Sequence, residues 1–108
     1  MILVVFRSRF SDDVDGSYDT TERHLAQKVR ELAGDDLVHL KNYQSEDGER
    51  LALVWWRSAE SLEKWRNDTE HQDAQRRGKE HWYSFYELSV AEVLRTSSSE
   101  DATAYPSE

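Results

Sequence analysis

The spacing of hydrophobic residues in the first third of the chain predicts a strand and then a helix. Residues 2–10, ILVVFRSRF, are rich in β-formers, and both alternating faces begin apolar, so we predict a strand that is covered on both sides. An acidic stretch follows, which suits the entry to a helix. We predict that this helix runs from Asp15 or Ser17 to Leu32 and ends at Gly34. Its apolar stripe contains Tyr18, Thr21, Leu25, Val29 and Leu32.

Two further strands are predicted in the middle of the chain. Residues 36–45 and residues 50–58 are rich in β-formers, and the Asp47-Gly48 pair between them is typical of a hairpin turn. Trp55 and Trp56 are consecutive, so their side chains point to opposite faces of the sheet. One of them is therefore expected in the core of the chain and the other on the side of a partner.

A broken helical region follows the third strand. Ser58 is a candidate N-cap, and Leu62 and Trp65 lie three residues apart on one helical face. The periodicity stops near residues 67–69. A second helical piece, capped by Asp68 or Thr69, is expected from Glu70 to about Arg77.

The last predicted strand covers residues 82–94, after a stop or kink at Gly78. Residues 96–108 are rich in Ser, Glu and Asp and contain the one proline of the chain. We expect this acidic tail to be disordered and the folded domain to span residues 1–95.

The order strand, helix, strand, strand, helix, strand is that of the α+β, ferredoxin-like βαββαβ fold, a four-stranded antiparallel sheet with its helices on one face. Apolar residues on the opposite face would then be exposed in a single chain. Monomers rarely tolerate so large an apolar patch. We therefore predict a homodimer in which the uncovered faces of the two sheets meet and form an α+β barrel.

Charge and composition exclude several classes of function. The 108 residues include 22 acidic and 14 basic ones, for a net charge of −8, so nucleic acid and anionic membranes are poor partners. No apolar run approaches the ~20 residues of a membrane span, and the N-terminus lacks the pattern of a signal peptide. We expect a cytoplasmic protein. Four Trp and five Tyr are many for so small a domain and suggest a ligand pocket or a subunit interface.

Metal chemistry is not expected. The chain contains no cysteine, so disulfides, thiolate nucleophiles and cysteine metal sites are excluded. His71 and His81 lie ten residues apart with Gly78 between them, which is not the spacing of two ligands on one helix face.

The region from Trp65 to Val93 contains three specific motifs. They are Trp65 on the second helical region, the segment "EH..AQ..G" that begins at Glu70, and "WY..Y...VAEV" that begins at Trp82. With these motifs the chain resembles, over residues 2–95, the antibiotic biosynthesis monooxygenase (ABM) family of the dimeric α+β barrel superfamily. The family contains cofactor-free oxygenases of aromatic polyketides and heme-degrading enzymes.

The heme-degrading branch of the family implies three marker residues. They are an Asn at the end of the first strand, a Trp on the second helix and a heme-ligating His about ten residues after that Trp. Trp65 satisfies the second requirement. Position 75 is Gln75, however, and the first strand offers Arg7 and Ser8 in place of the Asn. Heme degradation is therefore the weaker implication, with His71 as the remaining candidate ligand.

The cofactor-free branch implies a dry aromatic pocket, a proton acceptor and groups that stabilise an anion, because the deprotonated substrate itself reduces dioxygen. We predict that Trp65, Trp82, Tyr83 and Phe85 line the pocket. His71 is the candidate base, since an unperturbed imidazole has a pKa of ~6.5. The candidate partners of the anion or carbonyl are Arg7, Asn42 and Gln75. No cofactor is expected.

Each of these residues also has a purely structural interpretation. Trp65 can be a core residue, and His71 can be a surface or capping residue after the helix break. The primary hypothesis is a cofactor-independent monooxygenase that oxidises a small aromatic or quinonoid metabolite. The alternatives are a heme-binding or heme-degrading protein and a non-catalytic dimer that binds a small hydrophobic aromatic ligand.

Overall fold

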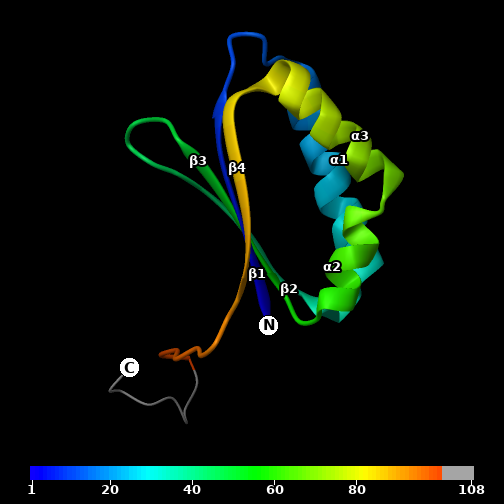
Figure 1. Cartoon of the computed structure of the whole chain (residues 1–108), viewed down its shortest axis with the longest axis vertical. Coiled ribbons are helices and arrows are strands. Elements are labelled where there is room, and N and C mark those ends of the chain that lie inside the picture. The colour runs from blue at the N-terminus through cyan, green and yellow to red at the C-terminus, as the bar shows by residue number, and fades with distance from the viewer. Residues whose placement is uncertain (101–108) are drawn as a thin grey trace.

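The computed structural model describes residues 1–100, in which helices pack on one side of a single sheet (Figure 1). The strands are β1 (Ile2–Phe10), β2 (Leu37–Gln44), β3 (Arg50–Trp56) and β4 (Tyr83–Glu92). The helices are α1 (Gly16–Ala33), α2 (Ala59–Arg66) and α3 (Thr69–Arg77). The short helical segments η1 (Gly34–Asp36) and η2 (Gly78–Trp82) precede β2 and β4. Residues 101–108, the larger part of the predicted tail, lie outside the described residues.

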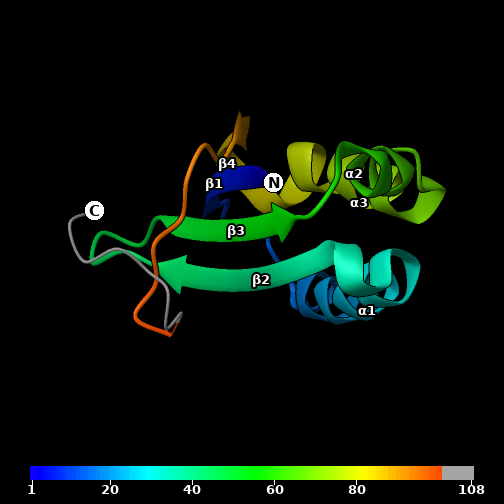
Figure 2. The same ribbon diagram turned by 90° about the horizontal axis from the view of Figure 1, so that it is seen from below.

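The four strands are antiparallel and lie in the order β2-β3-β1-β4. Figure 2 shows α1, α2 and α3 together on one side of the strands. The predicted ferredoxin-like fold is confirmed, with the second helical region divided into α2 and α3. In this topology, the two long connections that contain the helices both run over the same face of the sheet.

Local signals place the boundaries of the helices. Asp15 caps α1 by accepting a hydrogen bond from the Ser17 amide at 3.0 Å. Asp68 caps α3 through the His71 amide at 2.9 Å. Ser58 stands at the N-cap position of α2, but its hydroxyl donates to the Asp36 carboxylate at 3.4 Å instead of capping the helix.

The core lies between the helices and the sheet. Trp56 is 1% exposed and packs with Val4 of β1, Val29 of α1 and the α2 residues Leu62 and Trp65. A buried Trp side chain contributes a large apolar area to a core. Of the two consecutive tryptophans, Trp56 therefore belongs to the core of the single chain.

The strand register divides the sheet into two faces. Val4 pairs with Val54 on β3 and with Val90 on β4, and this face points to the helices. We call it the covered face. Leu3, Trp55 and Ala91 pair on the opposite, uncovered face. The uncovered face carries Leu3, Val5, Arg7, Arg9, Leu51, Leu53, Trp55, Phe85 and Glu87.

Some predicted boundaries differ from the structure. The third strand ends at Trp56 and not at residue 58, and the last strand begins at Tyr83 because Trp82 closes the π-helical turn η2. Leu32, predicted on the apolar stripe of α1, is 37% exposed. Val29 is in the core as predicted, but the next apolar residue of α1 to pack against the core is Ala33 and not Leu32.

Candidate functional site

An aromatic cluster lies at one end of the space between the helices and the covered face. It lies where β1 ends, α1 begins and β4 begins, near the top of Figure 1. Its members are Phe6, Phe10, Tyr18, Trp82 and Tyr83. The Phe10 and Tyr18 ring centres are 4.7 Å apart, and Tyr18 meets Trp82 edge to face at 5.4 Å. These are favourable aromatic geometries.

The π-helical turn η2 delivers Trp82 and Tyr83 to the cluster. A β-carbon on Gly78 would lie 2.6 Å from the Tyr83 ring, so only glycine allows this close approach. The carbonyl of Trp82 accepts a hydrogen bond from the Ser11 amide at 2.8 Å, which joins the turn to the end of β1. Such π-turns are frequent at functional sites.

Two charged side chains enter the cluster. The Arg50 guanidinium carbon lies 4.6 Å from the centre of the Phe10 ring and 5.9 Å from that of Tyr18. Glu22 follows Tyr18 by one turn of α1 and is half-buried. Within residues 1–100, Glu22 makes no hydrogen bond or ion pair, and Arg50 makes no ion pair.

Burial shifts the pKa values of the acids in the cluster. It raises the pKa of Glu22, against the opposing effect of the Arg50 charge. Burial also raises the pKa of Tyr18, and it raises that of Tyr83 further, with the Tyr18 hydroxyl and Glu22 adding to the shift. Both phenols are therefore neutral near pH 7, and they can donate hydrogen bonds to a carbonyl oxygen.

The predicted residues Trp65 and His71 lie together elsewhere in the same layer. The His71 ring stacks on Trp65 with centres 4.3 Å apart, and its Nδ1 lies 3.1 Å from the Trp65 carbonyl oxygen. Because a carbonyl only accepts, Nδ1 carries the proton in this bond and Nε2 is the basic nitrogen of the neutral ring. Burial lowers the pKa of His71, which keeps the ring neutral at pH 7.

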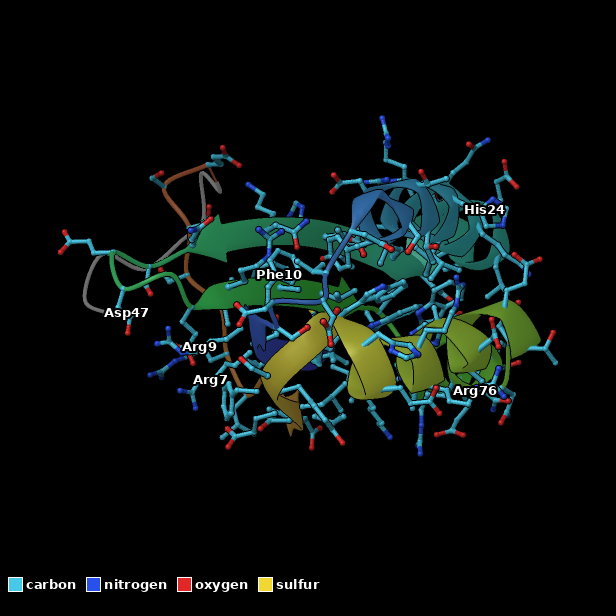
Figure 3. The ribbon with its side chains drawn as sticks, turned by 90° about the horizontal axis from the view of Figure 1, so that it is seen from above. Arg7, Arg9, Phe10, His24, Asp47 and Arg76 are labelled. Atoms are coloured by element: carbon cyan, nitrogen blue, oxygen red, sulfur yellow. The ribbon has the colours of Figure 1, made fainter. Side chains whose placement is uncertain are left out.

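The other predicted site residues are spread over the molecule. Asn42 is exposed on β2, at the edge of the covered face, and Gln75 is exposed on α3. Arg7 and Phe85 lie on the uncovered face, where the Arg7 guanidinium carbon is 5.4 Å from the Phe85 ring centre. Figure 3 shows Arg7 on the side of the sheet away from the helices. The structure thus brings together Trp82 with Tyr83, Trp65 with His71, and Arg7 with Phe85, but it does not gather all eight residues at one place.

Arg7 is also neutralised by neighbours. Its guanidinium forms ion pairs with Glu49 at 2.7 Å and with Glu87 at 3.2 Å. Together with Leu51, Leu53 and Tyr43, Arg7 and Glu49 line a hollow of about 500 Å³ on the uncovered face. Arg7 therefore belongs to a surface that is separate from the aromatic cluster.

Sequence reasoning missed Phe10, Tyr18, Glu22 and Arg50 as site residues. One signal for Glu22 was present, because its spacing from Tyr18 and Val29 places a carboxylate on the apolar stripe of α1. For Arg50, the signal would have been the register of β3 against β1, in which Arg50 pairs with Ser8 on the covered face.

A groove of about 400 Å³ lies between α1 and α3 and includes Thr20, His24, Glu70 and Arg77 in its lining. The His24 Nε2 atom lies 2.5 Å from Glu70, and the Lys28 ammonium bridges Glu70 and Asp68 at 3.0 and 2.9 Å. The Arg77 guanidinium carbon is 5.3 Å from the Trp82 ring. Through Arg77, the lining of the groove is thus close to the aromatic cluster.

In the described residues 1–100, no three His, Asp or Glu side chains converge in a way that could hold a metal ion. No helix in the same part of the chain has both the length and the apolar character that crossing a membrane requires.

Comparison with known proteins identifies the fold and the relatives of the chain. No family model matches the sequence. The uncharacterized protein YqjZ of Bacillus subtilis is 32% identical over 94 residues, which cover 85% of this chain and 78% of YqjZ. Rv0793 from Mycobacterium tuberculosis has the same fold, with a TM-score of 0.73 at 19% identity, over 90% of this chain and 98% of its own.

SnoaB from Streptomyces nogalater, a cofactor-independent oxygenase, superposes with a TM-score of 0.70 at 9% identity, over 88% of this chain and 94% of SnoaB. Solved structures from Deinococcus radiodurans, Nitrosomonas europaea and Caulobacter crescentus that share the fold are named as candidate antibiotic biosynthesis monooxygenases. These neighbours support the resemblance that the sequence predicts. The chain has the fold of the ABM proteins, and by its identity to YqjZ over most of both chains it belongs to the same family as that protein.

Proposed function

We propose that the protein is a cofactor-independent monooxygenase that oxidises a small aromatic or quinonoid metabolite with dioxygen. The observation that carries the proposal is the aromatic cluster on the covered face, which holds a carboxylate and a guanidinium that have no ion-pair partner in residues 1–100. A carboxylate that is partly removed from water and has no ion pair is costly, and such groups are typical of functional sites. The oxygenase activity named for SnoaB, which shares the fold, is consistent with this proposal.

The chemistry that such a site can perform is limited and simple. Flat aromatic walls bind a planar substrate and exclude water from it. Tyr18 and Tyr83, both neutral, donate hydrogen bonds to a substrate carbonyl, and Arg50 stabilises negative charge that develops on it. The substrate anion then transfers an electron to dioxygen without help from a metal or flavin.

We also propose that two copies associate through their uncovered faces. Leu3, Val5, Leu51, Leu53 and Trp55 are side by side in the register, on the face that no helix of residues 1–100 covers. An apolar surface of this kind is typical of an obligate interface. The site of each copy would then lie on the far side of its sheet from the interface.

Oxygen consumption tests the proposed activity. Dithranol, an anthrone, and a substituted hydroquinone are incubated with the protein in an oxygen-electrode cell, with and without EDTA. We expect a protein-dependent rate above the uncatalysed oxidation that EDTA does not reduce. No acceleration with any compound, together with saturable binding of the corresponding anthraquinone, would identify a passive binding protein instead.

The heme alternative has its own test in the same preparation. His71, the remaining candidate ligand, is stacked on Trp65 and uses its Nδ1 in a hydrogen bond, and Gln75 is exposed. We therefore expect hemin titration to give no saturable shift of the Soret band. A saturable shift that is lost in His71→Ala would contradict the proposal and assign the protein to heme chemistry.

A further inference from the structure

The proposed reaction requires a proton acceptor, and the chain offers two candidates between the helices and the sheet. His71 has a basic Nε2, but its ring stacks on Trp65 and bonds to the Trp65 carbonyl, and Trp65 is not a member of the aromatic cluster. Glu22 lies one helical turn after Tyr18. The charge of Arg50, which lies beside Tyr18, lowers the pKa of Glu22, and the charge of Asp19 raises it. A base takes a proton from the substrate, and a nearby cation stabilises the substrate anion that remains. The two groups are most effective when both face the same bound molecule.

Glu22 differs in its surroundings from the acids of residues 1–100 that form ion pairs. Glu49 and Glu87 pair with Arg7, Glu63 pairs with Arg66, and Glu70 pairs with Lys28. Glu22 is half-buried on the sheet-facing stripe of α1 and makes neither a hydrogen bond nor an ion pair within residues 1–100. A carboxylate that is removed from water and left without a donor destabilises the fold. Its oxygens remain free to take a proton from a bound molecule.

Resting on the proposed function, we infer that Glu22 is the proton acceptor and that Arg50 stabilises the anion that forms, with a phenolic or anthrone-type C–H or O–H acid as substrate. The substrate gives one proton to a Glu22 carboxylate oxygen, and the electron pair of the broken bond stays on the substrate. Arg50, placed over Phe10 and Tyr18, faces the resulting anion.

The later steps balance with dioxygen as the oxidant. The anion passes one electron to dioxygen, and the substrate radical and superoxide combine through a new C–O bond. Glu22 returns its proton to the peroxide. For an anthrone, loss of water from the hydroperoxide then breaks the O–O bond and the second C–H bond and leaves the quinone carbonyl. One dioxygen is consumed, one of its oxygen atoms enters the product and the other leaves as water.

The test is the isosteric variant Glu22→Gln, with Glu31→Gln on the exposed side of the same helix as its matched control. With dithranol, we expect Glu22→Gln to lower kcat by about a hundredfold or more, the usual contribution of a general base. The wild-type rate should fall as pH decreases and Glu22 is protonated, whereas the residual rate of the variant should not follow that limb. Glu31→Gln should behave as wild type.

A stability measurement separates this role from a structural one. Burial raises the pKa of Glu22, so ionising it costs folding free energy as pH rises above its ordinary value. Glu22→Gln should therefore keep or raise the Tm at pH 8, while loss of a structural contact would lower it.

The possible outcomes are distinguishable. An active wild type with an equally active Glu22→Gln overturns the inference and leaves the proposed function in place, and loss of turnover in His71→Asn alone would move the acceptor to His71. A lowered Tm of Glu22→Gln at pH 8 with unchanged pH dependence also overturns the inference. A wild type that accelerates the oxidation of no compound overturns the proposed function and the inference together.

Discussion

The charged side chains on the two faces of the sheet differ in whether they form ion pairs. On the uncovered face, Arg7 is held between Glu49 and Glu87, and Arg9 forms a 2.7 Å ion pair with Asp47. On the covered face, Arg50 lies over aromatic rings and Glu22 lies nearby without an ion pair among residues 1–100. Paired surface charges are typical of structure and solubility, whereas unpaired charges in a partly buried site are typical of function. The comparison therefore directs attention to Arg50 and away from Arg7.

Substitution of the two tryptophans at the end of β3 should have the largest effect on stability and tests the difference between the covered and uncovered faces. Trp56 on the covered face is 1% exposed, so Trp56→Ala leaves a cavity in the core and should lower the free energy of unfolding by about 3–5 kcal/mol. Trp55→Ala, on the uncovered face, should lower the free energy of unfolding clearly less. Both variants are compared at the same protein concentration, below the concentration at which two copies associate. Urea denaturation followed by circular dichroism measures both. Equal losses would mean that the faces are not distinguished as described.

A charge on the uncovered face should act on association and not on the site. Leu53 lines the apolar hollow of that face, and Leu53→Lys would place a cation where we propose that a second copy packs. Light scattering should give twice the 12.7 kDa chain mass for the wild type and the single chain mass for the variant. Gln27→Lys on the exposed side of α1 is the control, and it should remain dimeric. A monomeric wild type would refute the proposed interface.

The acid dependence of stability should have opposite signs for the two regions. Hydrogen bonds from Ser45 and the Glu49 amide, together with Arg9, lower the pKa of Asp47 to about 2 from 3.8. Its contribution is therefore present above pH 3.8 and lost as pH falls toward 2, whereas that of Glu22 is lost as pH rises. Asp47→Asn should lower the Tm at pH 7 and have no effect near pH 2. A Tm difference that does not change with pH would show that the ionised Asp47 carboxylate and its partners are not the cause.

Substitution of Arg7 is expected to have the smallest effect on stability. Its side chain is 43% exposed, and exposed ion pairs typically contribute less than about 1 kcal/mol. Below the protein concentration at which two copies associate, Arg7→Met should therefore leave the urea midpoint almost unchanged at moderate salt. A loss of several kcal/mol in the dissociated chain would contradict the exposed position of the pairs with Glu49 and Glu87.

The periodicity of the sequence was sufficient for the fold because the signals are local. The strand over residues 2–10, the caps Asp15 and Asp68, and the turn at Gly48 with its φ of 90° each depend on residues close in sequence. The predicted homodimer, the ligand and the catalytic roles stay predictions.

The site was harder to predict because it depends on contacts between distant segments. Strict alternation along β4 would place Tyr83 and Phe85 on one face, and both were predicted to line the pocket. The register shift between Arg9 and Phe10 separates them, so that Tyr83 meets Phe10 on the covered face and Phe85 meets Arg7 on the other. The positions of Arg50 and Glu22 require the β1–β3 register and the rotation of α1, which sequence patterns do not specify.

The most direct measurement is dithranol-dependent oxygen uptake by Arg50→Met and Arg7→Met under the conditions in which the wild type is active. Methionine keeps an apolar stem of similar length and removes the guanidinium in each case. We expect Arg50→Met to lose most of the activity and Arg7→Met to retain it, because Arg50 lies over the rings of the aromatic cluster and Arg7 lies on the opposite face. Retained activity in Arg50→Met, or loss in Arg7→Met without loss of the dimer, would contradict the assignment of the site to the covered face.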